Sequence, residues 1–107
     1  MDIRMLYVTC ASPGEARAIA QALVEARLAA CCNVLPGMES VYRWQGKLET
    51  AQETVLIAKT RDDLVDAATA KIKALHSYAV PCVMTIPVLN SGNPDYLAWL
   101  RSETASA

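Results

Sequence analysis

The chain has 107 residues, a formal net charge of −1 at pH 7 and a pI near 5.7. This length predicts a single domain over residues 1–107, and the charge excludes the basic surface typical of nucleic-acid-binding domains. No segment reaches the roughly 20 consecutive apolar residues of a membrane span. Hydrophobic residues make up 53% of the chain, a large share for a short protein. Such surplus apolar surface favours burial between subunits.

The cysteines indicate reduced thiols. Cys10, Cys31, Cys32 and Cys82 form no C-x-x-C pair, so their spacing matches neither a disulfide framework nor a zinc finger. A disulfide between the neighbours Cys31 and Cys32 would strain the backbone. The first fifteen residues lack a positive segment followed by a long apolar one, so we expect no signal peptide. A cytoplasmic location is therefore expected.

The first elements predicted are a strand and a helix. Residues 3–10, IRMLYVTC, are apolar, aromatic or β-branched, which predicts a strand covered on both faces. Over residues 12–28, Ser12 and Glu15 form a capping box with Pro13 at the first helical position, which predicts a helix. The apolar stripe of this helix consists of Ile19, Leu23 and Ala26.

A long hairpin follows. Residues 30–35 predict a second strand, which Pro36-Gly37 interrupts before residues 38–45 resume an alternating pattern. Gly46 marks a turn, and residues 52–59 return as a third strand. Such a hairpin is too long for so small a domain to cover alone. Tyr42 and Trp44 share one of its faces, so we expect them to pack against a neighbouring subunit, with a ligand platform as the alternative.

The second half begins with another predicted capping box. Thr60 and Asp63 would open a helix over residues 61–76, with an apolar stripe of Leu64, Ala68, Ile72 and Leu75. Lysines and His76 near its end complement the helix dipole.

The last elements are a strand and a short helix. Residues 80–89 predict a fourth strand, and its two prolines confine it to a sheet edge. Asn93-Pro94 begins a helix over residues 95–102 with Leu97 and Leu100 inward. The order β-α-β-β-α-β plus a terminal helix predicts an α+β, ferredoxin-like sandwich. Its antiparallel sheet would carry two helices on one face, with the first and third strands central.

Four motifs in this order carry a resemblance: RLAAC, WQGK, KTR and HSYAVP, followed by NPDYLAWL. On them the chain resembles the CutA divalent-cation-tolerance proteins over nearly its whole length. The resemblance implies a tight homotrimer, similar in architecture to the nitrogen-signalling trimers. It also implies copper binding by a cysteine after the first strand and a histidine at the end of the second helix. These positions fall on Cys10 and His76.

The chain departs from the family pattern beside these residues. Leu75 replaces the first histidine of a His-His pair, and Ser77, Ala79 and Cys82 stand where many relatives have a proline and two acids. A charged cleft is therefore in doubt here, while Cys82 adds a soft atom as a third candidate ligand. Thiolate and imidazole suit copper better than other divalent cations. The competing interpretation is structural, because free cysteine is commonly buried and a histidine suits a helix end.

Other function classes are less favoured by the residues. An enzyme would use Cys10 or Cys82 as nucleophile and His76 as base, but no orienting carboxylate or phosphate loop is evident. RNA binding would require aromatic residues on the central strands and a basic face. The alternative to the copper function is a regulatory trimer that holds a small ligand in the cleft between subunits, without a physiological metal.

Overall fold

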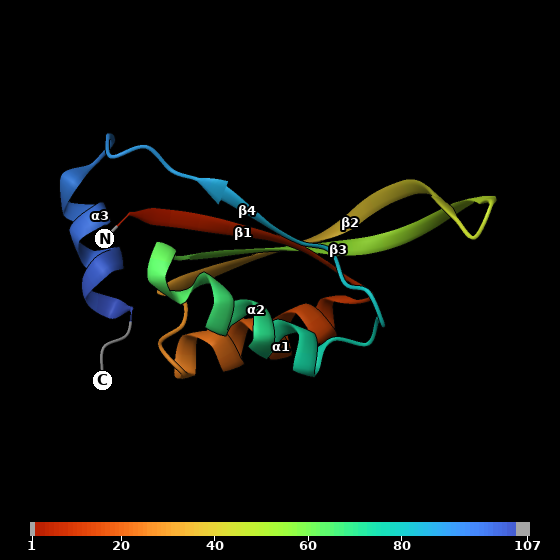
Figure 1. Cartoon of the computed structure of the whole chain (residues 1–107), viewed down its shortest axis with the longest axis horizontal. Helices are drawn as coiled ribbons and strands as arrows, with labels where there is room; N and C mark the ends of the chain where they lie inside the picture. Colours follow the sequence, from red (N-terminus) through yellow and green to blue (C-terminus); the bar gives the residue numbers. More distant parts are fainter. Residues whose placement is uncertain (1, 105–107) are drawn as a thin grey trace.

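The computed structural model describes residues 2–104, which form one four-stranded sheet and three α-helices (Figure 1). In chain order the elements are β1 (Ile3–Cys10), α1 (Pro13–Glu25), β2 (Cys31–Trp44), β3 (Lys47–Arg61), the 3-10 helix η1 (Asp62–Leu64), α2 (Val65–Leu75), β4 (Val83–Pro87) and α3 (Pro94–Glu103). The strands pair antiparallel in the order β2-β3-β1-β4. The predicted element order, and the central positions of the first and third strands, are confirmed.

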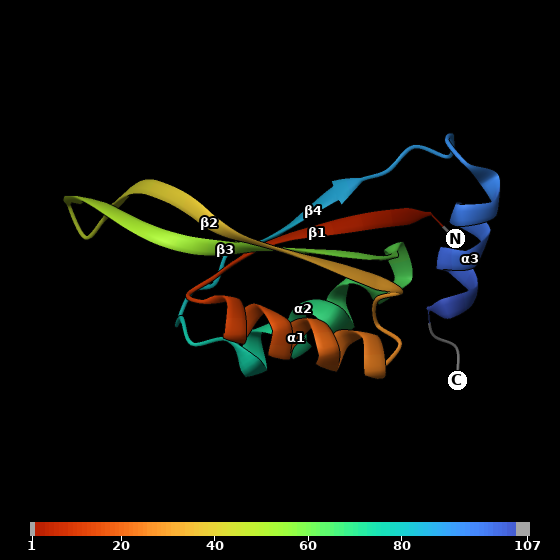
Figure 2. The ribbon, with the colours of Figure 1, turned by 180° about the vertical axis from the view of Figure 1, so that it is seen from behind.

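Helices α1 and α2 lie together on one face of the sheet, and Figure 2 shows the same layering from behind. Between these layers is the core, which includes Leu6 and Val8 of β1 together with Ile19 of α1 and Ile72 of α2. On the other face of β1, Tyr7 and its neighbours are only partly buried. The expectation that both faces of this strand are covered is therefore wrong for the single chain, because its helices cover only one.

Helix α1 begins as the capping pattern predicts. The Oγ of Ser12 accepts a hydrogen bond of 3.1 Å from the backbone N–H of Glu15. The Glu15 carboxylate turns back and accepts from the N–H of Ala11, also at 3.1 Å. The buried stripe consists of Ala16, Ile19 and Leu23. Ala26 is exposed, contrary to expectation, because the helix has already ended at Glu25.

The second capping box is absent. Thr60 remains in β3, because that strand pairs with β1 as far as the Ile3–Arg61 pair. Its buried hydroxyl donates a 2.6 Å hydrogen bond to the carbonyl oxygen of Leu28 instead. Helix α2 therefore begins after η1 with no side-chain cap. Of its expected apolar stripe, Ala68 and Ile72 are buried, Leu64 is partly buried and Leu75 is exposed.

Strand β2 runs through Pro36-Gly37 rather than stopping there. Leu35 pairs with Val55 but Met38 pairs with Glu53, so β2 carries one extra residue at a β-bulge. An edge strand tolerates this proline, because its outer side needs no donor. The prediction of an interruption is thus corrected to a bulge within one continuous strand.

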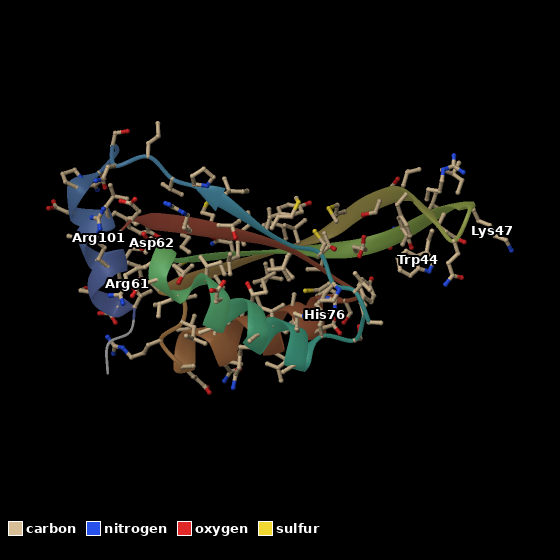
Figure 3. The ribbon with its side chains drawn as sticks, in the orientation of Figure 1. Trp44, Lys47, Arg61, Asp62, His76 and Arg101 are labelled. Carbon is tan, nitrogen blue, oxygen red and sulfur yellow. The ribbon has the colours of Figure 1, made fainter. Side chains whose placement is uncertain are left out.

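Beyond the bulge, β2 and β3 form a projecting hairpin, which we call the arm (residues 38–53). Gln45 and Gly46 both have positive φ, 51° and 79°, as a two-residue type I′ turn requires. Val41 and Leu48 are 68% and 69% exposed, which confirms that the domain does not cover its own hairpin. Figure 3 places Trp44 and Lys47 at the far end of the arm.

In the C-terminal part, strand β4 (Val83–Pro87) is shorter than expected and helix α3 (Pro94–Glu103) is longer. β4 covers five residues, and α3 begins at Pro94 with the Oδ1 of Asn93 accepting from the N–H of Asp95 at 3.1 Å. Leu100 is buried and Leu97 partly so. None of the helices within residues 2–104 has the length and apolar character needed to cross a membrane.

Candidate metal site and adjoining pocket

Three side chains with metal-ligating atoms converge where β1 ends. Cys10 closes β1, Glu15 lies in the first turn of α1, and His76 follows α2. The thiol sulfur, a carboxylate oxygen and a ring nitrogen lie within 4.8 Å of one another. Figure 3 shows His76 beside the helices, below the root of the arm. The structure thus brings together two predicted ligands, Cys10 and His76, and adds a carboxylate.

Both ring nitrogens of His76 are already hydrogen-bonded. Nδ1 lies 3.0 Å from the backbone N–H of Tyr78, so Nδ1 is the acceptor. Nε2 lies 2.8 Å from the carbonyl oxygen of Thr9 and therefore carries the proton and donates. The side chain is fully buried. These bonds fix the neutral ring in one tautomer and one orientation.

Glu15 is the member of this group that the sequence reasoning missed. Its carboxylate accepts from the N–H of Ser77 at 3.0 Å as well as from Ala11, and lies 3.7 Å from Nδ1 of His76. Burial alone would raise the pKa of Glu15, but its hydrogen bonds with Ser77 and Ala11 lower the pKa below its ordinary value. The signal was present in the sequence, since a capping-box glutamate follows the strand that ends in Cys10.

The Cys10 thiol is fully buried. Burial, together with the charges of Glu15 and Glu53, raises its pKa to about 11. The thiol is therefore protonated at neutral pH, and a metal ion would have to displace its proton. The same environment opposes a nucleophilic role, because reactive cysteines have lowered pKa values and partial exposure. The sequence did not make the Glu15 carboxylate beside His76 evident. Its charge raises the pKa of the Cys10 thiol and so does not activate it.

Cys82, the third predicted ligand, is not part of this group. It instead lines an adjoining pocket of about 490 Å³ between the arm and the segment after α2, which we call the arm pocket. The pocket is lined by Thr9, Ser40, Val41, Tyr42, Trp44, Glu53, Tyr78, Val80 and Cys82. Tyr42 and Trp44 thus form part of its wall and remain 42% and 51% exposed.

Glu53 and Tyr78 join the arm to the segment after α2. The phenol of Tyr78 donates a 2.9 Å hydrogen bond to Oε2 of Glu53, whose side chain is buried. Burial and this bond, with the charges of Glu53 and Glu15, raise the pKa of Tyr78 to about 12. The phenol is therefore a proton donor at neutral pH. Neither residue was singled out from the sequence, because nothing in local spacing relates positions 53 and 78.

The chemistry of the three converging donors fits a soft-to-borderline cation. Thiolate, imidazole and carboxylate are all ligands of first-row transition metals, which they bind through bonds of about 2.0–2.3 Å. Cys10 and His76 would hold the ion, with Glu15 as a third ligand. A ring nitrogen becomes available only when His76 gives up its bond to Tyr78 or to Thr9.

Comparison with known proteins relates the chain to one family. Residues 4–103 match the family model described as CutA1 divalent ion tolerance protein. Among relatives, the chain is 45% identical to the divalent-cation tolerance protein CutA of Thermus thermophilus over 94% of this chain and 96% of that protein. It is 44% identical to the chloroplastic protein CutA 1 of Oryza sativa over 94% of this chain, but spans only 56% of that protein.

Solved structures give the same relationship. The crystal structure of CutA1 from Oryza sativa superposes with a TM-score of 0.95 at 41% identity, covering 100% of this chain and 97% of that one. Family model, sequence relatives and fold therefore agree over almost the whole described chain. The chain belongs to the CutA1 divalent ion tolerance family.

Proposed function

We propose that the protein is a homotrimer that binds a divalent cation, copper in preference to others, through Cys10 and His76 with Glu15 beside them. The observation that carries the proposal is the convergence of a thiol, a carboxylate and an imidazole within 4.8 Å, in a chain of the divalent ion tolerance family. Copper leads the divalent cations in affinity for nitrogen and sulfur ligands. Cys82 would join only if the segment after α2 rearranged.

Metal analysis of the purified, reduced protein tests this proposal. The wild type and Cys10→Ala would be exposed to copper under anaerobic conditions, desalted and measured side by side. We expect the wild type to retain copper and the variant to lose most of it. Equal retention would remove Cys10 from the site. Mg²⁺, which prefers oxygen ligands, serves as a control that neither protein should retain.

The trimer is supported by the surfaces that the single chain leaves uncovered. Strands β2 and β4 are open sheet edges, and the arm exposes apolar side chains. The element order and the strand order β2-β3-β1-β4 support a ferredoxin-like subunit. We also propose that the protein acts in the cytoplasm without catalysing turnover, since its buried, protonated thiol is a poor nucleophile.

A second candidate function is a regulatory trimer that holds a small ligand in the cleft between subunits. The arm pocket favours it, because a volume of about 490 Å³ lies within the range of small-molecule sites. The exposed halves of Tyr42 and Trp44 would then face the neighbouring subunit at the edge of the pocket. Metal and ligand binding involve different side chains, so each can be tested separately.

A further inference from the structure

We propose that the arm pocket binds a small organic ammonium cation, with Glu53 as its counter-ion. This rests on the second candidate function in treating the pocket as a ligand site, and it adds the chemical class of the ligand. It does not depend on metal binding at Cys10 and His76. Three features of the pocket carry the proposal: its charge, its aromatic wall and its size.

Charge is the first feature. Within residues 2–104, Glu53 is the one charged side chain that lines the pocket, and it is 9% exposed. The hydroxyl of Tyr78 occupies one acceptor position of its carboxylate, which has roughly four such positions in all. An anionic ligand would be repelled there. A neutral ligand would take water from the carboxylate without replacing it by an opposite charge, which is unfavourable.

A second carboxylate strengthens this negative character. Glu15 lies close enough for its charge, like that of Glu53, to raise the pKa values of both Cys10 and Tyr78. Among the described residues, no lysine or arginine lines the pocket to offset these two acids. Charge complementarity therefore selects a cation.

The aromatic wall is the second feature. Tyr42, Trp44 and Tyr78 all line the pocket, and the faces of such rings attract ammonium groups. Val41 and Val80 add apolar surface that suits the hydrocarbon part of an amine. A bare metal ion would make no use of this apolar wall. The lining therefore favours a ligand with a charged head and an apolar body.

Size is the third feature. About 490 Å³ accommodates a small molecule but not a folded partner. A lysine or arginine of a neighbouring subunit would offer the same charge, and in that case a soluble probe would be excluded. We commit to a free small cation, and the experiment distinguishes the two.

Calorimetric titration with three matched probes tests the proposal. Phenethylammonium, 2-phenylethanol and 3-phenylpropionate have similar aromatic bodies and differ in charge. We expect phenethylammonium to bind the wild type at least about tenfold more tightly than the other two, as expected for a charge-assisted hydrogen bond. Equal affinities for the three probes, or no binding of any of them at millimolar concentration, would overturn the proposal. Exclusion by a neighbouring subunit's side chain would give the latter result.

A matched pair of variants assigns the charge to Glu53. Glu53→Gln keeps an acceptor for Tyr78 but removes the charge, and should weaken phenethylammonium binding about tenfold. Glu39→Gln removes a charge from an exposed position on β2 and should bind like the wild type. Equal binding by wild type and Glu53→Gln would overturn the proposal. If Glu53→Gln does not fold, the affinities of the wild type for the three probes decide the proposal alone.

Copper retention measured on the same preparations separates this proposal from the metal function. Retained copper with no preference for the ammonium probe means that only the arm-pocket proposal fails. Preferential binding of the ammonium probe by a protein that retains no copper supports the arm-pocket proposal while removing the metal function. The two failures therefore give different results.

Discussion

The backbone N–H of Tyr78 donates a 3.0 Å hydrogen bond to Nδ1 of His76, while the phenol of the same tyrosine donates to Glu53 at 2.9 Å. One residue therefore contacts both the candidate metal site and the arm pocket. If Nδ1 is to coordinate a metal ion, the backbone at Tyr78 must move away from the ring. Such a movement would also disturb the phenol that helps to form the pocket.

Antagonism between the two sites is the first prediction. We expect copper to weaken the binding of phenethylammonium, and phenethylammonium to weaken copper binding by the same factor, because coupling between equilibria is reciprocal. Calorimetric titrations with and without the other ligand measure this factor. In His76→Ala the effect of copper should disappear. An unchanged ammonium affinity in copper-loaded wild-type protein would contradict the coupling.

The second prediction concerns the ligands. Cys10→Ser and His76→Ala should each lower copper affinity about tenfold or more, since each removes a donor of the proposed site. Cys31→Ser is the matched control and should not change it. Cys82→Ser should have a smaller effect than Cys10→Ser, because its thiol is outside the converging group. Competition with a chelator gives the affinities, and equal values for the wild type, Cys10→Ser and His76→Ala would disprove the site.

The third prediction is that copper affinity rises with pH. The pKa of Cys10 is raised to about 11, so binding as a thiolate releases one proton throughout the neutral range. Apparent affinity should increase about tenfold for each pH unit between roughly pH 7 and 9. Cys10→Ser should show a clearly weaker dependence. A wild-type affinity that is constant over this range would mean that the thiolate is not a ligand.

The fourth prediction concerns stability. Thr60→Val removes the hydroxyl that donates to Leu28 and leaves that carbonyl oxygen without this donor. The free energy of unfolding should fall by about 1–3 kcal/mol. Thr50→Val makes the same substitution at an exposed position of β3 and should change it by less than about 0.5 kcal/mol. Urea unfolding at one fixed protein concentration provides the comparison, and similar losses in both variants would argue against a role for this bond.

The fifth prediction is the oligomeric state. Light scattering should give about three times the 11.6 kDa of one chain, without dissociation on dilution. Trp44→Glu places a charge on an aromatic surface that is half exposed in the single chain, and should give aggregated or unfolded protein. A folded, soluble monomer of the wild type would contradict both expectations.

Most of the fold was predictable because its signals are local. Alternation, the capping box at Ser12 and the edge prolines place strands, a helix and sheet edges from neighbouring residues alone. The error at Thr60 shows the limit of such signals. Thr60 has the sequence pattern of a helix cap but lies in β3, because pairing with β1 and the hydrogen bond to Leu28 hold it in the strand.

The candidate site was less predictable because its members are distant in the chain. Cys10 and His76 were found through the family resemblance, not through their spacing. Glu15 was recognised only as a cap, although its carboxylate also reaches Ser77, 62 residues away. Glu53 and Tyr78 meet only when the arm and the segment after α2 are folded together. No local pattern contains that information.

The bulge at Pro36-Gly37 changes which residues of strand β2 face the helices, because it adds one residue to the alternation of side chains. Cys32 and Val34 pair with Ala58 and Leu56, on the face that carries the helices. After the extra residue, Tyr42 pairs with Glu49. Glu49 is an odd number of residues from Leu56 in β3, so it lies on the face opposite the helices. Had the same residues paired without a bulge, unbroken alternation from Cys32 would have carried Tyr42 and Trp44 to the helical side. Arg43 would then have stood on the opposite face in their place.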